Sequence, residues 1–175
     1  MALVDRACRA RSESRKLGLV DSPFVANVRD LPWFSSEAMG AMCTFESDGR
    51  RFEQVGYNLV VLEPGQRGAQ YHRELDNQED FLILSGACIA VVEGQEHLLG
   101  QWDFVHCPPG IAHAFVAVGE EPCVIFMCGG RHGNRYLFVR DDVALRHGIG
   151  VDVETSDQAE AYSALPKWQP AEPAV

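Results

Sequence analysis

The stretch GQRGAQYHRELDNQEDFLILSG, residues Gly65–Gly86, carries the pattern that decides the fold. His72 and Glu74 are two positions apart, so on a β-strand both side chains point to the same face. The residues LDNQ then make a turn, and Glu79 opens the returning strand with the same parity as the apolar residues two and four positions later. One imidazole and two carboxylates therefore converge at neighbouring strand ends.

A second stretch, GQWDFVHCPPGIAH at Gly100–His113, supports this interpretation. Taken alone, the first stretch also fits a solvated, charge-rich hairpin. In the second, a strand runs into a tight Pro-Pro-Gly turn, and His113 opens another apolar strand. A single histidine in an apolar strand is more often a packed core residue than a ligand. Two such stretches in this order favour a functional site.

Short apolar runs continue from Tyr57 to Val139. They are rich in Val, Ile, Leu and Phe, and Gly, Pro, Asn or Asp separates them. The runs are YNLVVLE, AQYHRE, EDFLILS, ACIAVVEG, QEHLLG, WDFVHCP, HAFVAVG, CVIFMCG and RYLFV. Short strands at regular intervals predict an all-β sandwich or barrel and exclude alternating βα units.

The two quoted stretches resemble the paired motifs of the cupin superfamily. Glu74 stands where the first motif has its second histidine, and Ala117 stands where an asparagine often follows the second motif. The resemblance spans roughly residues 55–130. More specifically, the sequence resembles a group of uncharacterised bacterial single-domain cupins. It implies a double-stranded β-helix, or jelly-roll, barrel with short N- and C-terminal extensions. The matching residues are Gly65, His72, Glu79 and Gly86, then Gly100, Asp103, Pro108, Gly110 and His113.

The resemblance also implies one divalent metal ion inside the barrel. Carried over to this sequence, His72, Glu79 and His113 are ligands. Glu74 is either a fourth ligand, which we favour, or a general acid or base beside the ion. Imidazole and carboxylate ligands suit iron, manganese, nickel, cobalt or zinc, and the sequence leaves the element open.

Two further residues are candidates for the pocket. Gln70 shares strand parity with His72 and can line the cavity. His106 precedes Pro108 by two positions and either faces the barrel interior or packs within its strand. The remaining histidines lie in polar or loop-like contexts and are expected at the surface: His97, His132 and His147.

Three segments are expected along the chain. Residues 1–54 form an N-terminal extension with edge strands, residues 55–140 form the barrel, and residues 141–175 form a helical and extended tail. The tail holds two helix candidates, DVALRHG and DQAEAYSAL, which we interpret as packing or dimerisation elements. A homodimer is expected, because pairing would cover exposed sheet edges and the Trp33-Phe34 segment.

Composition narrows the partners. The formal net charge is -10, which disfavours nucleic acid and anionic membrane surfaces. No apolar run is long enough to span a bilayer, and the N-terminus lacks the apolar core of a secretory signal, so a cytoplasmic location is expected. The six cysteines mostly lie in apolar runs without CxxC spacing, which indicates small buried hydrophobes and not disulfides.

These features favour a metal-dependent enzyme that acts on a small organic substrate. The reaction is either dioxygen activation or Lewis-acid chemistry of the isomerase or lyase type. Hydrolysis is less favoured, since no oxyanion stabiliser is evident. The alternative is a cupin that binds or senses a small ligand without catalysis, and fold alone does not decide between them.

Overall fold

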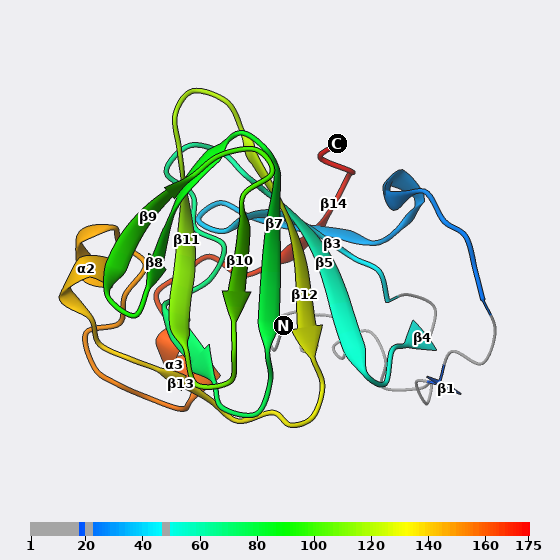
Figure 1. The fold of residues 1–175 in the computed structure, drawn as a ribbon. Coiled ribbons are helices and arrows are strands. Elements are labelled where there is room, and N and C mark those ends of the chain that lie inside the picture. Colours follow the sequence, from blue (N-terminus) through cyan, green and yellow to red (C-terminus); the bar gives the residue numbers. More distant parts are fainter. Residues whose placement is uncertain (1–17, 20–22, 47–49) are drawn as a thin grey trace.

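The computed structural model describes residues 18–19, 23–46 and 50–175, and the N-terminal segment before residue 18 lies outside this part. Two antiparallel sheets face each other and form a barrel (Figure 1). The first sheet has seven strands in the order β10 (Phe104–Cys107), β7 (Glu79–Ser85), β12 (Cys123–Gly130), β5 (Val55–Leu62), β3 (Gly40–Thr44), β2 (Trp33–Ser36) and β14 (Gln169–Ala171).

The second sheet has five strands, and it runs in the order β13 (Tyr136–Phe138), β6 (His72–Glu74), β11 (Ala112–Val118), β8 (Ala87–Val92) and β9 (Gln95–Leu99). The short strands β1 (Gly18–Leu19) and β4 (Arg50–Arg51) pair in parallel apart from both sheets. A 3₁₀-turn, η1, covers Val28–Asp30, and two short helices, α2 (Asp142–Arg146) and α3 (Gln158–Ala161), lie in the C-terminal segment. The all-β architecture expected from the sequence is confirmed.

The main core lies between the two sheets. Strand β7 shows why: Glu79, Phe81 and Ile83 are buried, and the residues between them are less so. This period of two places every second side chain in the interior. The core cluster draws on both sheets and includes Val60, Leu62, Phe81, Ile83, Ala90, Phe115 and Ile125.

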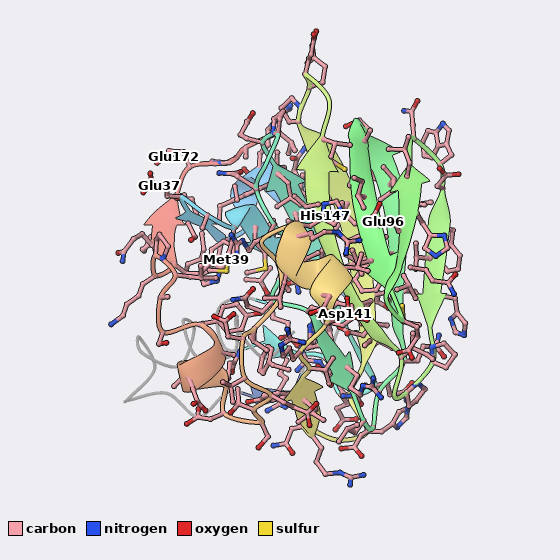
Figure 2. The ribbon with its side chains drawn as sticks, turned by 90° about the vertical axis from the view of Figure 1, so that its left-hand side faces the viewer. Glu37, Met39, Glu96, Asp141, His147 and Glu172 are labelled. Atoms are coloured by element: carbon pink, nitrogen blue, oxygen red, sulfur yellow. The ribbon has the colours of Figure 1, made fainter. Side chains whose placement is uncertain are left out.

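The outer face of the five-stranded sheet is covered by α2 (Figure 2). Ala144 of the helix and the following Ile149 pack in a second cluster with Tyr71, Val91 and Val116. Asp141 caps the helix, because its side chain accepts hydrogen bonds from the backbone N–H groups of the second and third following residues.

The N-terminal strands belong to the larger sheet. Strand β3 pairs with β5, and β2 lies between β3 and β14. Trp33 and Phe34 are buried within this chain, and Trp33 Nε1 donates a hydrogen bond to the carbonyl of Val28. These two side chains are therefore not available as a dimer contact, contrary to the expectation from sequence. The homodimer itself stays a prediction.

The turn between β7 and β8 requires glycine. Gly86 has a φ of +70°, and a Cβ at this position would collide with the carbonyl of Pro122. Only glycine adopts this conformation without steric cost. Gly86 thereby allows the chain to pass directly from one sheet to the other.

Four cysteines, Cys43, Cys88, Cys107 and Cys123, are buried as free thiols, and Cys128 is half-buried. Burial raises the pKa of Cys43 to about 11, so this thiol is protonated at neutral pH. These residues act as small core side chains, as the sequence indicated.

We predict that Ile83→Ala lowers the free energy of unfolding by about 2–5 kcal/mol, because it leaves a cavity between the two sheets. Leu98→Ala is the control, since Leu98 is 74% exposed, and it should change stability by less than about 0.5 kcal/mol. Urea denaturation of both variants measures the difference. Equal effects would show that the interface between the sheets is not the main core.

Candidate metal centre

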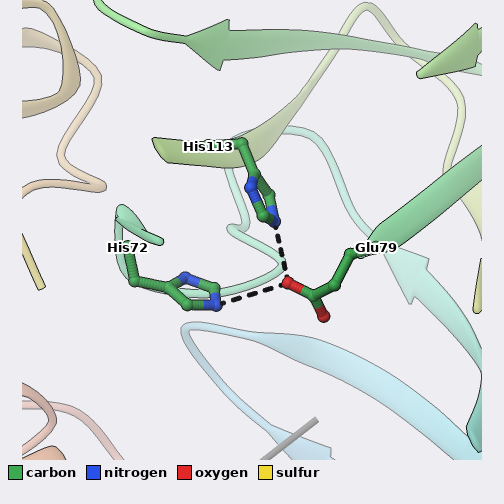
Figure 3. A group of neighbouring side chains, drawn as sticks. All are labelled: His72, Glu79 and His113. Atoms are coloured by element: carbon green, nitrogen blue, oxygen red, sulfur yellow. Dashed lines mark ion pairs between the residues drawn. The ribbon is translucent and has the colours of Figure 1, made fainter. Parts of the chain in front are cut away.

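Three predicted ligands from three strands converge inside the barrel. His72 on β6 and His113 on β11 are direct partners across the five-stranded sheet, and Glu79 starts β7 in the opposite sheet. Both Nε2 atoms point at Glu79 Oε2, at 3.8 Å from His72 and 3.2 Å from His113 (Figure 3). The ligand atoms of the three residues all lie within 4.8 Å of one another.

Backbone carbonyls fix the orientation of both imidazoles. His72 Nδ1 lies 2.7 Å from the carbonyl of Gln70, and His113 Nδ1 lies 3.1 Å from the carbonyl of Ile111. An acceptor at this position requires Nδ1 to carry a proton, which leaves a lone pair on Nε2 in the neutral ring. Metal-binding histidines are commonly held in this way.

The site requires a positive charge. Burial lowers the pKa of His72 to about 4. Burial also acts to lower the pKa of His113, but its hydrogen bonds to Cys107 and Glu79 raise the value to about 10. Burial likewise opposes the charge on Glu79, yet the two imidazoles hold the pKa of this carboxyl well below its usual range. A proton on His113, or a metal ion, can balance the buried carboxylate.

The donor set fits a divalent transition metal. Bonds of about 2.0–2.2 Å to imidazole nitrogen and carboxylate oxygen place ligand atoms of one ion roughly 3–3.5 Å apart. The two nitrogen–oxygen separations in the structure, 3.2 and 3.8 Å, lie close to this range. Two imidazoles and one carboxylate also leave coordination positions open.

Glu74 lies in the same cavity but outside this group of three. It is buried, and its Oε2 accepts a hydrogen bond of 2.9 Å from Asn77 Nδ2. Burial raises the pKa of Glu74, and the nearby charge of Glu79 adds to this effect. The structure thus places Glu74 beside the three ligands, and its role as a fourth ligand stays a prediction.

Asn77 was not singled out in the sequence. It is buried in the turn between β6 and β7, and its Oδ1 accepts hydrogen bonds from the backbone N–H groups of His132 and Gly133. Its Nδ2 donates to Glu74 and to the carbonyl of Gly133. The side chain therefore ties Glu74 to a loop more than fifty residues away. Its turn sequence carries no signal of these contacts.

A cavity of about 60 Å³ adjoins the three ligands. Its wall is mostly apolar and aromatic, and the rings of Phe81 and Phe138 lie 5.0 Å and 5.6 Å from those of His113 and His72. The other apolar lining residues include Met42, Val60, Phe115 and Met127, and the polar or amphipathic ones include Asn58, Glu74, Tyr136, Gln158, Tyr162 and Trp168.

Three of these lining residues come from the C-terminal segment, which we interpreted from the sequence as packing or dimerisation elements. Gln158, Tyr162 and Trp168 form part of the cavity wall. The hydroxyl of Tyr162 accepts a hydrogen bond from the backbone N–H of Gln70, and its ring packs edge-on against Phe138. No local motif marks these residues, because only the return of the chain brings them to the barrel.

The two other pocket candidates do not line the cavity. Gln70 is buried, but its side chain donates a hydrogen bond to the carbonyl of Ala161. This bond links Gln70 to the C-terminal segment. His106 lies on the outer face, where its Nδ1 is 2.6 Å from Asp80 and half its side chain is exposed. The physical reason is strand parity: its neighbour Cys107 pairs with Glu79 and points inward.

The comparisons with known proteins agree with this geometry. Residues 58–129 match the family description of the cupin domain. This part of the chain is a cupin domain. The match covers the three strands that carry the ligands.

Solved structures with the same fold support the architecture of the cupin domain. An uncharacterised conserved protein with a double-stranded β-helix domain from Klebsiella pneumoniae is 15% identical, with a TM-score of 0.54 over 66% of this chain and 96% of that one. Pac13, a nucleoside dehydratase from Streptomyces, is 10% identical, with a TM-score of 0.53 over 65% and 86%. At these identities the likeness concerns the fold alone.

A proposed sugar phosphate isomerase from Acidithiobacillus ferrooxidans is 25% identical, with a TM-score of 0.48, and the match covers 56% of this chain. The chain spans only 64% of that protein's length. No curated protein sequence matches this chain significantly. Among the described residues, no helix is long and apolar enough to cross a membrane.

We predict that zinc or nickel binds the cupin domain and raises its melting temperature, since the ion would link the two sheets through Glu79 and the histidines. At a hundredfold excess over Kd, the expected increase is roughly 5–10 °C. His113→Ala should abolish the increase and remove near-stoichiometric metal from elemental analysis. His106→Ala is the control and should behave as wild type, because its side chain lies on the outer face. Equal metal content in both variants would refute the site.

We also predict that Asn77→Ala lowers the free energy of unfolding by about 1–3 kcal/mol, because the buried carboxylate of Glu74 loses its hydrogen-bond donor and the backbone N–H groups of His132 and Gly133 lose their acceptor. Metal content should be unchanged, since Asn77 does not belong to the ligand group. Calorimetry and elemental analysis on the same sample test both statements. Loss of metal together with unchanged stability would contradict this role.

Proposed function

We propose that the protein is a metal-dependent enzyme that moves a proton on a small organic substrate. The reaction is an isomerisation or an elimination. One observation carries the proposal: a buried carboxylate that is not one of the three grouped ligands, Glu74, lines the same cavity as His72, Glu79 and His113. Proton transfer next to a carbonyl or hydroxyl needs such a pair, namely an electrophile and a separate acid or base.

The residues of the cavity have different proposed roles in the reaction. His72, Glu79 and His113 would hold a divalent ion, which would supply Lewis acidity toward a carbonyl or hydroxyl oxygen. Glu74 Oε2 is held by Asn77, which leaves Oε1 to take a proton from the substrate or return it. The rings of Phe81 and Phe138 pack against His113 and His72, and an apolar surrounding strengthens the electrostatic interactions of charged groups inside it.

The fold of Pac13 is compatible with this proposal, because its name identifies a dehydratase on a similar barrel. At 10% identity the likeness transfers no substrate and no catalytic residue. The proposal therefore depends on the arrangement of Glu74 and the three ligands.

Dioxygen activation is the second candidate. Two histidines and one carboxylate with open positions are the ligand set of many non-haem iron oxygenases, and this chain presents that set. In this reaction Glu74 would have no required proton to move. A barrel that only binds or senses a small ligand is the third possibility and predicts no turnover of either kind.

We predict that the metal-loaded protein exchanges the carbon-bound protons of dihydroxyacetone with deuterium from D₂O, followed by proton NMR. Glu74→Gln should slow this exchange by about 10²-fold or more while metal content stays near wild type. The substitution keeps an acceptor for Asn77 and removes the ability to carry the proton. The matched control is Glu96→Gln, an exposed carboxylate on the far side of the sheet, which pairs with His147 (Figure 2).

The other outcomes separate the alternatives. Metal loss in Glu74→Gln would make Glu74 a fourth ligand and reject its acid–base role. Oxygen uptake by the iron-loaded protein with organic substrates, without deuterium exchange, would favour an oxygenase. Neither activity, with metal bound, would favour a binding or sensing protein.

A further inference from the structure

The charges of the cavity bear on the kind of molecule that enters it. Among the described residues that line it, no lysine or arginine is present, whereas two carboxylates, Glu74 and Glu79, are. Apart from the two ligand histidines, the remaining lining residues are uncharged. A phosphate group in this space would therefore have no guanidinium or ammonium partner, although such partners are the usual means of binding it.

Four arginines lie around this end of the barrel, but none lines the cavity, and each is engaged elsewhere. Three face carboxylates, which balance their charges within the protein, and the fourth donates a hydrogen bond to a neutral amide. The pairs are Arg73 with Glu93 at 3.8 Å, Arg131 with Glu46 at 2.7 Å, Arg135 with Asp76, and Arg67 with Gln70 at 3.5 Å.

The covering C-terminal segment is also neutral where it meets the cavity. It contributes the amide of Gln158, the phenol of Tyr162 and the indole of Trp168. Lys167 is exposed and is not a lining residue. A substrate tail that extends from the metal toward this segment meets hydrogen-bonding groups without a full charge.

The space is small. About 60 Å³ lies far below the hundreds of cubic ångströms of a pocket for a drug-sized ligand.

We infer that the substrate is a small, uncharged, oxygen-rich molecule such as a hydroxyketone, and that the site rejects the phosphate ester of the same skeleton. The inference rests on the proposed metal site and deepens it by naming the substrate class. Its basis is the lack of a lining cation in the described part of the chain, the two carboxylates in the cavity, and the neutral groups of the covering segment.

The test compares dihydroxyacetone with dihydroxyacetone phosphate on the cobalt-loaded protein. Both can approach the ion through the same hydroxyketone, and only one carries a phosphate. Titration of each against the visible absorption of bound cobalt gives two dissociation constants. We expect dihydroxyacetone to bind at least tenfold more tightly. Equal or tighter binding of the phosphate ester, or no spectral change with dihydroxyacetone, would overturn the inference.

A second experiment adds a positive charge to the cavity wall. Gln158→Arg places a cation at the cavity wall and should shift the ratio of the two dissociation constants at least tenfold toward the phosphate ester. Gln95→Arg, on the exposed strand β9, adds the same charge away from the cavity and should leave the ratio unchanged. A ratio that is the same in both variants would show that cavity charge does not select the substrate.

These outcomes are separate from those of the proposed function. Failure to load cobalt in the wild type would remove the metal site itself. Normal loading with a preference for the phosphate ester would keep the metal-dependent function and reject only the substrate class.

Discussion

The carboxylate of Glu79 between two imidazoles is the interaction on which the site depends. It is buried, and it joins β7 of one sheet to β6 and β11 of the other. A buried carboxylate is tolerated only when positive charge and hydrogen bonds surround it. The barrel therefore needs a proton on His113 or a cation at this point, and the group of three side chains is compatible with one metal ion.

The surrounding structure serves to hold these three side chains in place. The backbone carbonyls of Gln70 and Ile111 orient the imidazoles, and aromatic rings pack against both of them. The core between the sheets keeps β7 at its distance from β11. Preorganisation of this kind lets a site bind an ion without rearranging its own ligands.

Glu74 and the C-terminal segment add what distinguishes this barrel. The carboxylate replaces an imidazole of the common motif, and Asn77 links it to the loop before β13. Tyr162 and Trp168 add a phenol and an indole to the cavity lining. Among the described residues, the cavity lining thus combines apolar walls with two carboxylates and no lysine or arginine, and the proposed neutral substrate rests on this combination.

The sequence by itself determined the strands of the barrel, because alternation of buried and exposed residues is a local property. It also identified His72, Glu79 and His113, since their parity and their two motifs are readable along the chain. Tertiary structure alone decided the rest. It turned His106 outward through its pairing with Asp80, gave Asn77 its partners, and brought Tyr162 to the cavity from a distant segment. Such contacts depend on the path of the whole chain in space, which no local pattern encodes.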